Sequence, residues 1–282
     1  MNARAILTLL VAILVPAGAL AESAPSQQSL WALDAAWTRP AGSWSIGVFA
    51  PARYAFTDTL ELEVPPLVFL VAPTATVRVA HVKRPGLAIT GEYGFSVPTF
   101  GLGLTRGYLF SSGAQTGKIG WFVVPQAGLV ATIPVGERAQ LTGRASVAVG
   151  LPVAGETTVS SLDSPLAPLD LMTAPLLRRF RARVGAGYDR ALLPWLRLRT
   201  SLDGYLVGSP PEGFAQSSPL FISGHVGLDF RVGGQSRFTL GGIWWNWDQF
   251  HSEVRVGPEG FAERVHVRSN DFLPTIDFIW SN

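Results

Sequence analysis

The sequence predicts an all-β protein, a transmembrane antiparallel up-and-down β-barrel of about twelve strands, within a range of ten to fourteen. Mean hydropathy is positive, at +0.27, although 15% of the residues are charged. After residue 21, no apolar run reaches the roughly eighteen residues that a membrane helix needs. High but dispersed hydrophobicity fits strands in which every second residue faces lipid. Such a sheet must close on itself, because hydrocarbon does not tolerate open strand edges.

The first 21 residues are typical of a secretory signal peptide. Arg4 precedes an apolar core at residues 5–15, and the small residue Ala21 marks the expected cut. An uncleaved membrane anchor is the alternative, but the apolar core is too short to cross roughly 30 Å of hydrocarbon. We therefore expect residues 1–21 to be removed and residues 22–282 to form one β-barrel domain in the cell outer membrane.

Composition excludes several kinds of chemistry. The chain has no cysteine, so a disulfide framework, thiol chemistry and a lipidated amino terminus are excluded. The 22 basic residues nearly balance the 20 acidic ones, which gives no support for a nucleic-acid partner. The expected partners are outer-membrane lipid and lipopolysaccharide, the outer-membrane assembly machinery and, if the barrel is a scaffold, other envelope proteins.

Alternation of apolar and polar residues marks the strands. It is clearest over residues 139–151, where Leu141, Val147 and Val149 alternate with Gln140 and Arg144. In chain order, the expected strands are 29–38, 44–57, 60–71, 74–83, 86–97, 119–133, 139–151, 180–189, 196–206, 219–232, 237–248 and 272–280. Their even number is the one expected of a single-chain bacterial barrel.

The lengths of the gaps between strands indicate which end of the barrel each gap occupies. The even-numbered gaps, at 58–59, 84–85, 134–138, 190–195 and 233–236, are all short. Four odd-numbered gaps, at 98–118, 152–178, 209–218 and 249–271, are long, whereas the first two odd gaps are short. Outer-membrane barrels sort their connections in this way, with tight periplasmic turns and long extracellular loops. A soluble β-sandwich also has alternating strands, but it has no reason to sort its loops.

The last strand and the tryptophans fit the same interpretation. Phe272, Ile276, Phe278 and Trp280 alternate toward the end of the chain, as in the terminal strand of many outer-membrane barrels. Tryptophans expected at the two membrane interfaces are Trp121, Trp195, Trp244, Trp245, Trp247 and Trp280. A sugar-binding aromatic platform at residues 244–247 is the alternative.

One hairpin carries a resemblance to a group of known proteins. Over residues 45–64, an aromatic strand with Tyr54 and Phe56 runs into a Thr57-Asp58 turn and then Leu-Glu-Leu. This stretch resembles proteobacterial outer-membrane β-barrel proteins of an uncharacterised, porin-like family. The resemblance implies a barrel hairpin and carries over no catalytic or ligand-binding residue.

If the apolar strand faces meet lipid, the opposite faces line the lumen. This predicts that the lumen is lined by Arg78, Arg144, Arg179, Arg181, Arg183, Arg197, Arg199, Arg231, Arg237, Glu61, Glu63, Glu92, Asp203, Asp229 and Asp277. Arg183 and Arg199 fall on adjacent strands, so an arginine band could favour anionic solutes. The alternative is a salt-bridged interior that props the barrel and blocks it, since buried arginine is normally paired with carboxylates.

The sequence offers little enzyme chemistry. Ser223, His225 and Asp229 share one strand face, but residues two apart on a strand splay roughly 7 Å from one another, too far for a hydrogen-bonded triad. No metal-ligand spacing or phosphate-binding glycine motif is recognisable, so we expect no enzyme activity, no cofactor and no metal. The long loop at 152–177 is unexpectedly apolar. It either folds inward as a plug or presents an outer contact surface.

These features favour a porin-like passive channel for small, in particular anionic, solutes. The competing hypothesis is a closed structural barrel that anchors a multiprotein cell-envelope complex. A soluble periplasmic binding module is a third class.

Overall fold

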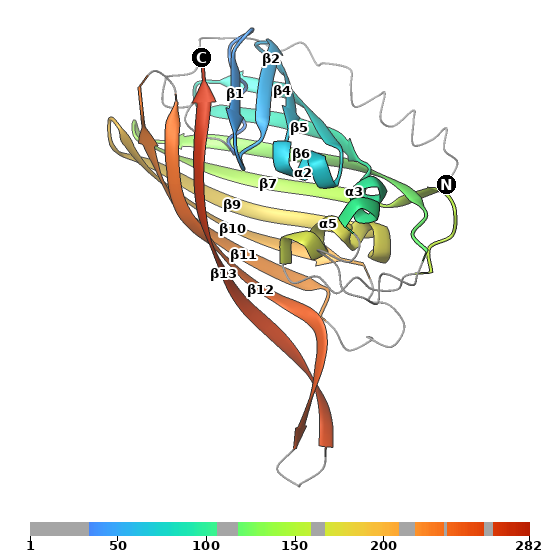
Figure 1. The fold of residues 1–282 in the computed structure, drawn as a ribbon. Helices are drawn as coiled ribbons and strands as arrows, with labels where there is room; N and C mark the ends of the chain where they lie inside the picture. The colour runs from blue at the N-terminus through green and yellow to red at the C-terminus, as the bar shows by residue number, and fades with distance from the viewer. Residues whose placement is uncertain (1–33, 106–117, 159–166, 209–217, 234–235, 257–261) are drawn as a thin grey trace.

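A computed structural model describes residues 34–105, 118–158, 167–208, 218–233, 236–256 and 262–282. Within them, twelve antiparallel strands form a closed ring (Figure 1). In ring order these are β1 (Trp44–Gly47), β2 (Ala52–Thr57), β3 (Leu60–Val64), β4 (Thr74–Arg84), β5 (Leu87–Ser96), β6 (Trp121–Val135), β7 (Ala139–Val149), β9 (Phe180–Leu193), β10 (Leu196–Val207), β11 (Leu220–Arg231), β12 (Arg237–Val256) and β13 (Ala262–Ser281). The first and last strands pair, with Ser45 opposite Ser281, so the predicted closed barrel is confirmed.

The remaining elements lie in the connections between strands. The short strand β8 (Leu151–Ala154) pairs with the start of β6. Three helices are described, α2 (Pro66–Val71), α3 (Pro98–Thr105) and α5 (Ala167–Arg178), and each connects two strands of the ring. Among the described residues, no helix is long and apolar enough to cross a membrane.

The barrel has a polar inside and an apolar outside. On β10, Arg197 and Asp203 are buried on the inner face, whereas Leu202 and Leu206 are exposed on the outer face. The same division holds on β11, where Asp229 is fully buried and Val226 is 57% exposed. Strand side chains alternate between the two faces, so the alternation in the sequence becomes this division directly.

The predicted sorting of the connections is confirmed. The turns after β2, β4, β6, β9 and β11 are short, and the connections after β5 and β7 are long enough to hold α3 and α5. Two of the short turns place Gly136 and Gly233 at positive φ, 68° and 79°. Glycine reaches this left-handed conformation without the strain that a Cβ would cause.

The beginning of the chain corrects the strand prediction. Residues 34–38 form no strand, and the predicted strand at 44–57 is instead the hairpin of β1 and β2. The Asp277 carboxylate stabilises the connection between β1 and β2 by accepting hydrogen bonds from the backbone N–H groups of Val48, Phe49 and Ala50. The two errors cancel, so the strand number stays at twelve.

A second correction concerns residues 60–71, which were expected to be one strand. Strand β3 ends at Val64, and α2 begins at Pro66. Proline cannot donate to a strand ladder, but it fits the first turn of a helix, where its missing N–H would have no partner. The apolar residues 66–71 are therefore helical and do not continue strand β3.

The last hairpin continues beyond the ring. Residues 252–256 of β12 pair with residues 262–266 of β13, after an irregularity that begins at Asp248. Figure 1 shows the two strands running on past the barrel wall as a ribbon. The predicted excursion at 249–271 is thus an extension of the last hairpin.

Candidate functional site in the barrel interior

The structure places most of the predicted lumen residues on the inner face. Buried or half-buried there are Arg78, Arg144, Arg181, Arg183, Arg197, Arg199, Arg237, Glu61, Glu63, Glu92, Asp203, Asp229 and Asp277. Two arginines depart from the prediction. Arg179 is exposed in the bend between α5 and β9, where its φ of 73° takes it out of the strand alternation. Arg231 is exposed at the end of β11.

The first group of interior charges, which we call the Glu61 cluster, joins β2, β3, β4 and β5. Arg78 Nη1 contacts Glu61 Oε2 at 2.7 Å, and Arg78 Nε contacts Glu92 Oε1 at 3.1 Å. Arg53 Nη2 lies 2.7 Å from Glu63 Oε2, and Arg39 Nε lies 3.7 Å from Glu61 Oε1. The cluster consists of three arginines and three glutamates, so its formal charges cancel.

The second group, the Asp34 cluster, also balances three arginines with three carboxylates. Its members are Arg144, Arg183, Arg199, Asp34, Asp203 and Asp229. Arg183 Nε donates to Asp203 Oδ1 at 3.0 Å, and Arg199 contacts Asp229 at 3.5 Å and Asp34 at 3.9 Å.

These pairs bear on the two alternatives for the lumen, an arginine band that favours anionic solutes and a salt-bridged interior. Arg183 and Arg199 do lie on adjacent strands, but each has an aspartate within 4 Å. The protein's own carboxylates therefore neutralise most of the positive charge of these two arginines. For these two residues the salt-bridged interior describes the structure better.

The N-terminal interior segment, residues 34–39, runs inside the ring. Its backbone is hydrogen-bonded to inward side chains of three strands: Arg78 Nη2 donates to the Ala35 carbonyl at 2.5 Å, Thr90 Oγ1 donates to the Ala36 carbonyl, and the Ala36 N–H donates to Thr132 Oγ1 at 2.8 Å. Polar strand residues thus satisfy the buried backbone groups of the segment, as burial requires.

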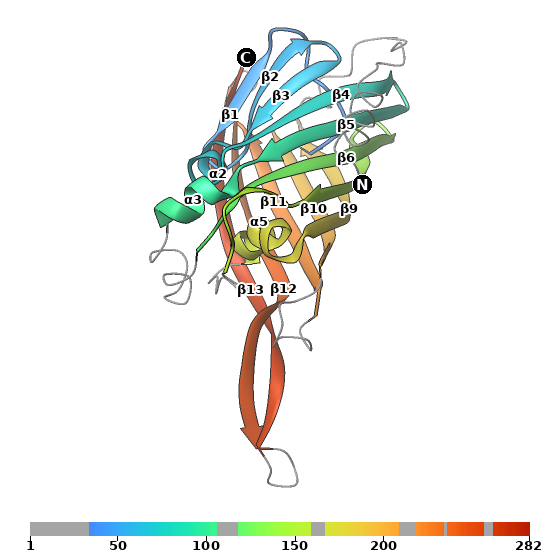
Figure 2. The same ribbon diagram turned by 90° about the vertical axis from the view of Figure 1, so that its right-hand side faces the viewer.

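Helix α5 also lies inside the ring (Figure 2). Ala167, Leu171 and Ala174 of α5 belong to an apolar cluster whose strand members are Val207, Phe221, Trp245 and Trp247. Residues 167–177 of the apolar loop therefore fold inward, whereas Val153 near its beginning is 65% exposed on β8.

This packing corrects the placement of two tryptophans. Trp245 is 7% exposed and Trp247 is fully buried, so neither belongs to an outer aromatic girdle. They lie on the inner face of β12, where the apolar side of α5 covers them. By contrast, Trp121, Trp195, Trp244 and Trp280 are all more than one-third exposed.

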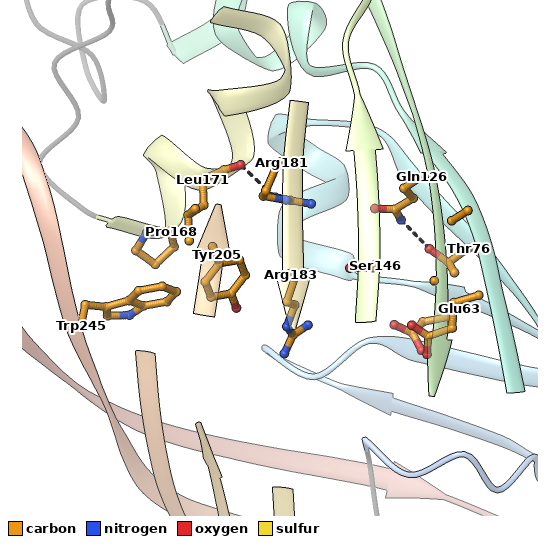
Figure 3. Close-up of a pocket in the computed structure, with 13 residues that line it drawn as sticks. Glu63, Thr76, Gln126, Ser146, Pro168, Leu171, Arg181, Arg183, Tyr205 and Trp245 are labelled. Carbon is orange, nitrogen blue, oxygen red and sulfur yellow. Dashed lines mark hydrogen bonds between the residues drawn. The ribbon is translucent and has the colours of Figure 1, made fainter. Parts of the chain in front are cut away.

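A cavity of about 320 Å³ lies against α5 within the ring. Pro168 and Leu171 of the helix, with Tyr205 and Trp245, form its apolar side. Arg181 and Arg183 of β9 line it as well, and its remaining polar lining includes Glu63, Thr76, Glu92 and Gln126. Figure 3 shows Arg181 and Arg183 between these two sides.

Two donors in this lining lack a full complement of partners. Arg181 Nη1 donates to the Leu171 carbonyl at 2.8 Å, but among the described residues no carboxylate lies within 4.0 Å of its guanidinium group. The Trp245 Nε1–H group is buried and makes no hydrogen bond with any described residue. Sequence alternation assigned Arg181 to the lumen, but neither its missing partner nor the orphan indole could be read from the sequence.

Sequence reasoning assigned Trp195 and Trp280 to a membrane interface but missed that phenylalanines join them in one aromatic row on the outer face near the short turns. Trp195 stacks on Phe230 with ring centroids 6.3 Å apart, and Phe230 lies 6.2 Å from Phe238. Phe238 is opposite Phe278 in the β-ladder, and the Phe278 ring lies 4.6 Å from Trp280. These residues form one row only because β10 pairs with β11, β11 with β12, and β12 with β13.

The serine, histidine and aspartate noted in the sequence do not converge on a shared hydrogen bond. Asp229 accepts from Thr239 Oγ1 at 2.8 Å and pairs with Arg199. The residues that the structure describes contain no group of three or more histidine, aspartate or glutamate side chains able to hold a metal ion.

The fold and its interior define a class of protein, a closed antiparallel barrel of twelve strands with an ion-paired, partly filled lumen. No family model matches the chain, and no curated protein matches it. Among solved structures, the crystal structure of a Pseudomonas aeruginosa FadL homologue matches with a TM-score of 0.37 and 10% sequence identity, covering 85% of this chain and 67% of that one. At this identity and TM-score, the likeness assigns neither a family nor a function.

Proposed function

We propose that the chain is an outer-membrane β-barrel that passes small solutes through its interior. The membrane part of the proposal rests on the barrel having an apolar outer face and a polar interior. Large apolar side chains such as Leu129, Val184, Leu202 and Ile276 are each more than half exposed on the outer face, while charged residues are buried inside. Water does not favour such a surface, whereas hydrocarbon does, and a closed ring has no strand edge to satisfy.

The aromatic row supports the same location. Aromatic side chains gather where barrels meet the membrane interface, and the row from Trp195 to Trp280 lies at the end of the barrel that carries the short turns. Under this proposal that end faces the periplasm, residues 1–21 are the export signal, and residues 22–282 form the mature domain. The exported protein should stay with the outer-membrane fraction of cells, and its recovery in osmotic-shock fluid would contradict the proposal.

The transport part of the proposal rests on one observation, the cavity against α5. An open porin needs a continuous water-filled path, but segment 34–39 and α5 occupy this lumen. We therefore favour a gated passage, in which the segment or the helix moves to let a solute reach the cavity. The proposed solutes are small, because the cavity measures about 320 Å³, at the lower end of the usual range for ligand pockets.

Planar bilayer recordings test this proposal directly. We expect low conductance from the chain lacking residues 1–21 and a several-fold higher conductance from a variant that begins at residue 40. Because the shortened chain could fail to fold, Thr90→Val with Thr132→Val provides a second way to release the segment, by removing two of its hydrogen bonds. Thr200→Val, the same change on the outer face of β10, is the matched control. Absence of conductance steps from every folded variant would contradict the passage and favour a closed structural barrel.

A further inference from the structure

We infer that the cavity against α5 is a binding site for a small aromatic monocarboxylate, with the carboxylate at Arg181 and the ring against Trp245, Tyr205 and Leu171. The inference names a solute class for the proposed passage and rests on that function. It is carried by three independent features of the cavity, namely its charge, its unused donors and its apolar wall.

Among the described residues of the interior, no carboxylate is paired with Arg181. The Glu61 and Asp34 clusters each balance three arginines with three carboxylates, and neither includes Arg181. The nearest interaction of its guanidinium is a hydrogen bond to the neutral Leu171 carbonyl. A largely buried cation without a paired anion is costly, so this position attracts an anionic ligand.

The second feature is the Trp245 indole. Its Nε1–H group is buried in the same cavity lining and finds no acceptor among the described residues. Buried donors are normally hydrogen-bonded, and an orphan donor at a cavity marks a place where an acceptor is missing. The cavity lining therefore offers a second donor, besides Arg181, to a ligand oxygen.

The third feature is the composition of the wall around these donors. Pro168 and Leu171 of α5 lie beside Tyr205 and Trp245, whose ring centroids are 5.8 Å apart. Aromatic rings pack well on such a wall in offset or edge-to-face geometry. The ligand is therefore amphipathic, with an anionic end and a flat apolar body.

The opposite wall argues against a cationic ligand. Glu63 and Glu92 also line the cavity, but Arg53 lies 2.7 Å from Glu63 and Arg78 lies 3.1 Å from Glu92. Their charges are therefore already matched by arginines. Gln126 and Thr76 are likewise bonded to each other, with Gln126 Nε2 donating to Thr76 Oγ1 at 2.9 Å.

Isothermal titration of the folded chain in detergent with benzoate tests the site, and benzyl alcohol of similar shape is the uncharged comparison. We expect saturable benzoate binding with one site per chain and much weaker binding of benzyl alcohol. Quenching of tryptophan fluorescence by benzoate provides a second readout, because Trp245 lies in the wall. Equal affinity for the two compounds would overturn the assignment of the anionic end.

Three variants locate the site. Arg181→Gln should weaken benzoate binding by roughly tenfold or more, because a hydrogen bond to a charged group is lost. Arg190→Gln, the same substitution at an exposed position of β9, should leave binding unchanged. Trp245→Phe keeps an aromatic wall but removes the N–H group, and should weaken binding by a smaller factor. Retained benzoate affinity in folded Arg181→Gln would refute the site, and heat-modifiable gel mobility reports folding.

The binding measurement does not depend on transport, so the two proposals can fail separately. If benzoate binds and needs Arg181, but no variant shows conductance or flux, the binding site is supported and the passage is contradicted. If the protein conducts, but benzoate does not bind and neither benzoate nor Arg181→Gln alters the conductance, the passage is supported and the binding site is contradicted.

Discussion

At the scale of single residues, the interior is organised by pairing charges that cannot reach water. Arg78 is fully buried; it forms ion pairs with Glu61 and Glu92 and donates a hydrogen bond to the Ala35 carbonyl. A buried ion pair adds little net stability over an apolar pair, but removal of one partner leaves an uncompensated charge. The arginines are therefore held in place by the carboxylates that they neutralise.

This argument predicts an asymmetry between single and double substitution. Arg78→Leu should lower the free energy of unfolding by about 3–5 kcal/mol, because Glu61 is then buried without its closest cation. Arg78→Leu combined with Glu61→Leu should recover a large part of this loss. Urea unfolding in detergent micelles or lipid vesicles measures both values, and a double variant less stable than the single one would contradict the argument.

At the scale of elements, α5 shows how an apolar helix is accommodated in a polar lumen. One side packs on Phe221, Trp245 and Trp247, while the Leu171 carbonyl accepts from Arg181. The last helical turn carries Arg178, a cation at the end of the helix where a positive charge is favourable. The helix is thus fixed by contacts with strands that lie far from it in sequence.

Loosening these contacts should open the lumen. Leu171→Ala leaves a cavity in this apolar cluster, where Leu171 is 3% exposed, and should loosen α5 and raise bilayer conductance several-fold. Met172→Ala, at the half-buried neighbouring position of the same helix, is the control and should have a much smaller effect. Equal conductance of the two variants would argue against α5 as a barrier.

At the scale of the whole molecule, the outer surface sets the environment in which the ring is stable. Exposed apolar side chains lie on strands around the ring, from Leu129 on β6 to Ile276 on β13. This apolar surface is stabilised by an apolar environment, whereas the interior is held together by hydrogen bonds, ion pairs and the apolar packing of α5.

A depth-dependent cost of charge follows if lipid covers this surface. Val226→Arg, in the middle of β11, should destabilise the folded chain by about 2–4 kcal/mol in vesicles, whereas Val232→Arg, just beyond the end of that strand, should cost about 0–1 kcal/mol. Both valines are more than half exposed, so a barrel in water would tolerate both changes equally. Urea unfolding in phospholipid vesicles separates these outcomes.

The sequence by itself determined the closed barrel and the alternation of short turns with longer connections along most of the chain. These features depend on period-two alternation and on turn residues such as Gly136 and Gly233, which act over a few neighbouring positions. It also assigned most interior charges to the correct strand face, because alternation is a local property. It assigned Trp245 and Trp247 wrongly to an outer girdle, because the sequence does not show that α5 covers them inside the barrel.

Only the tertiary structure decided what fills the barrel. Segment 34–39 is fixed by Thr90 and Thr132, and α5 by Phe221 and Trp247, through contacts between residues distant in the sequence. The pairing of each arginine, and hence the unpaired state of Arg181 toward any described carboxylate, likewise depends on strand register. Local alternation predicts whether a side chain points into or out of the barrel. Contacts between residues distant in the sequence decide which residues an inward side chain contacts.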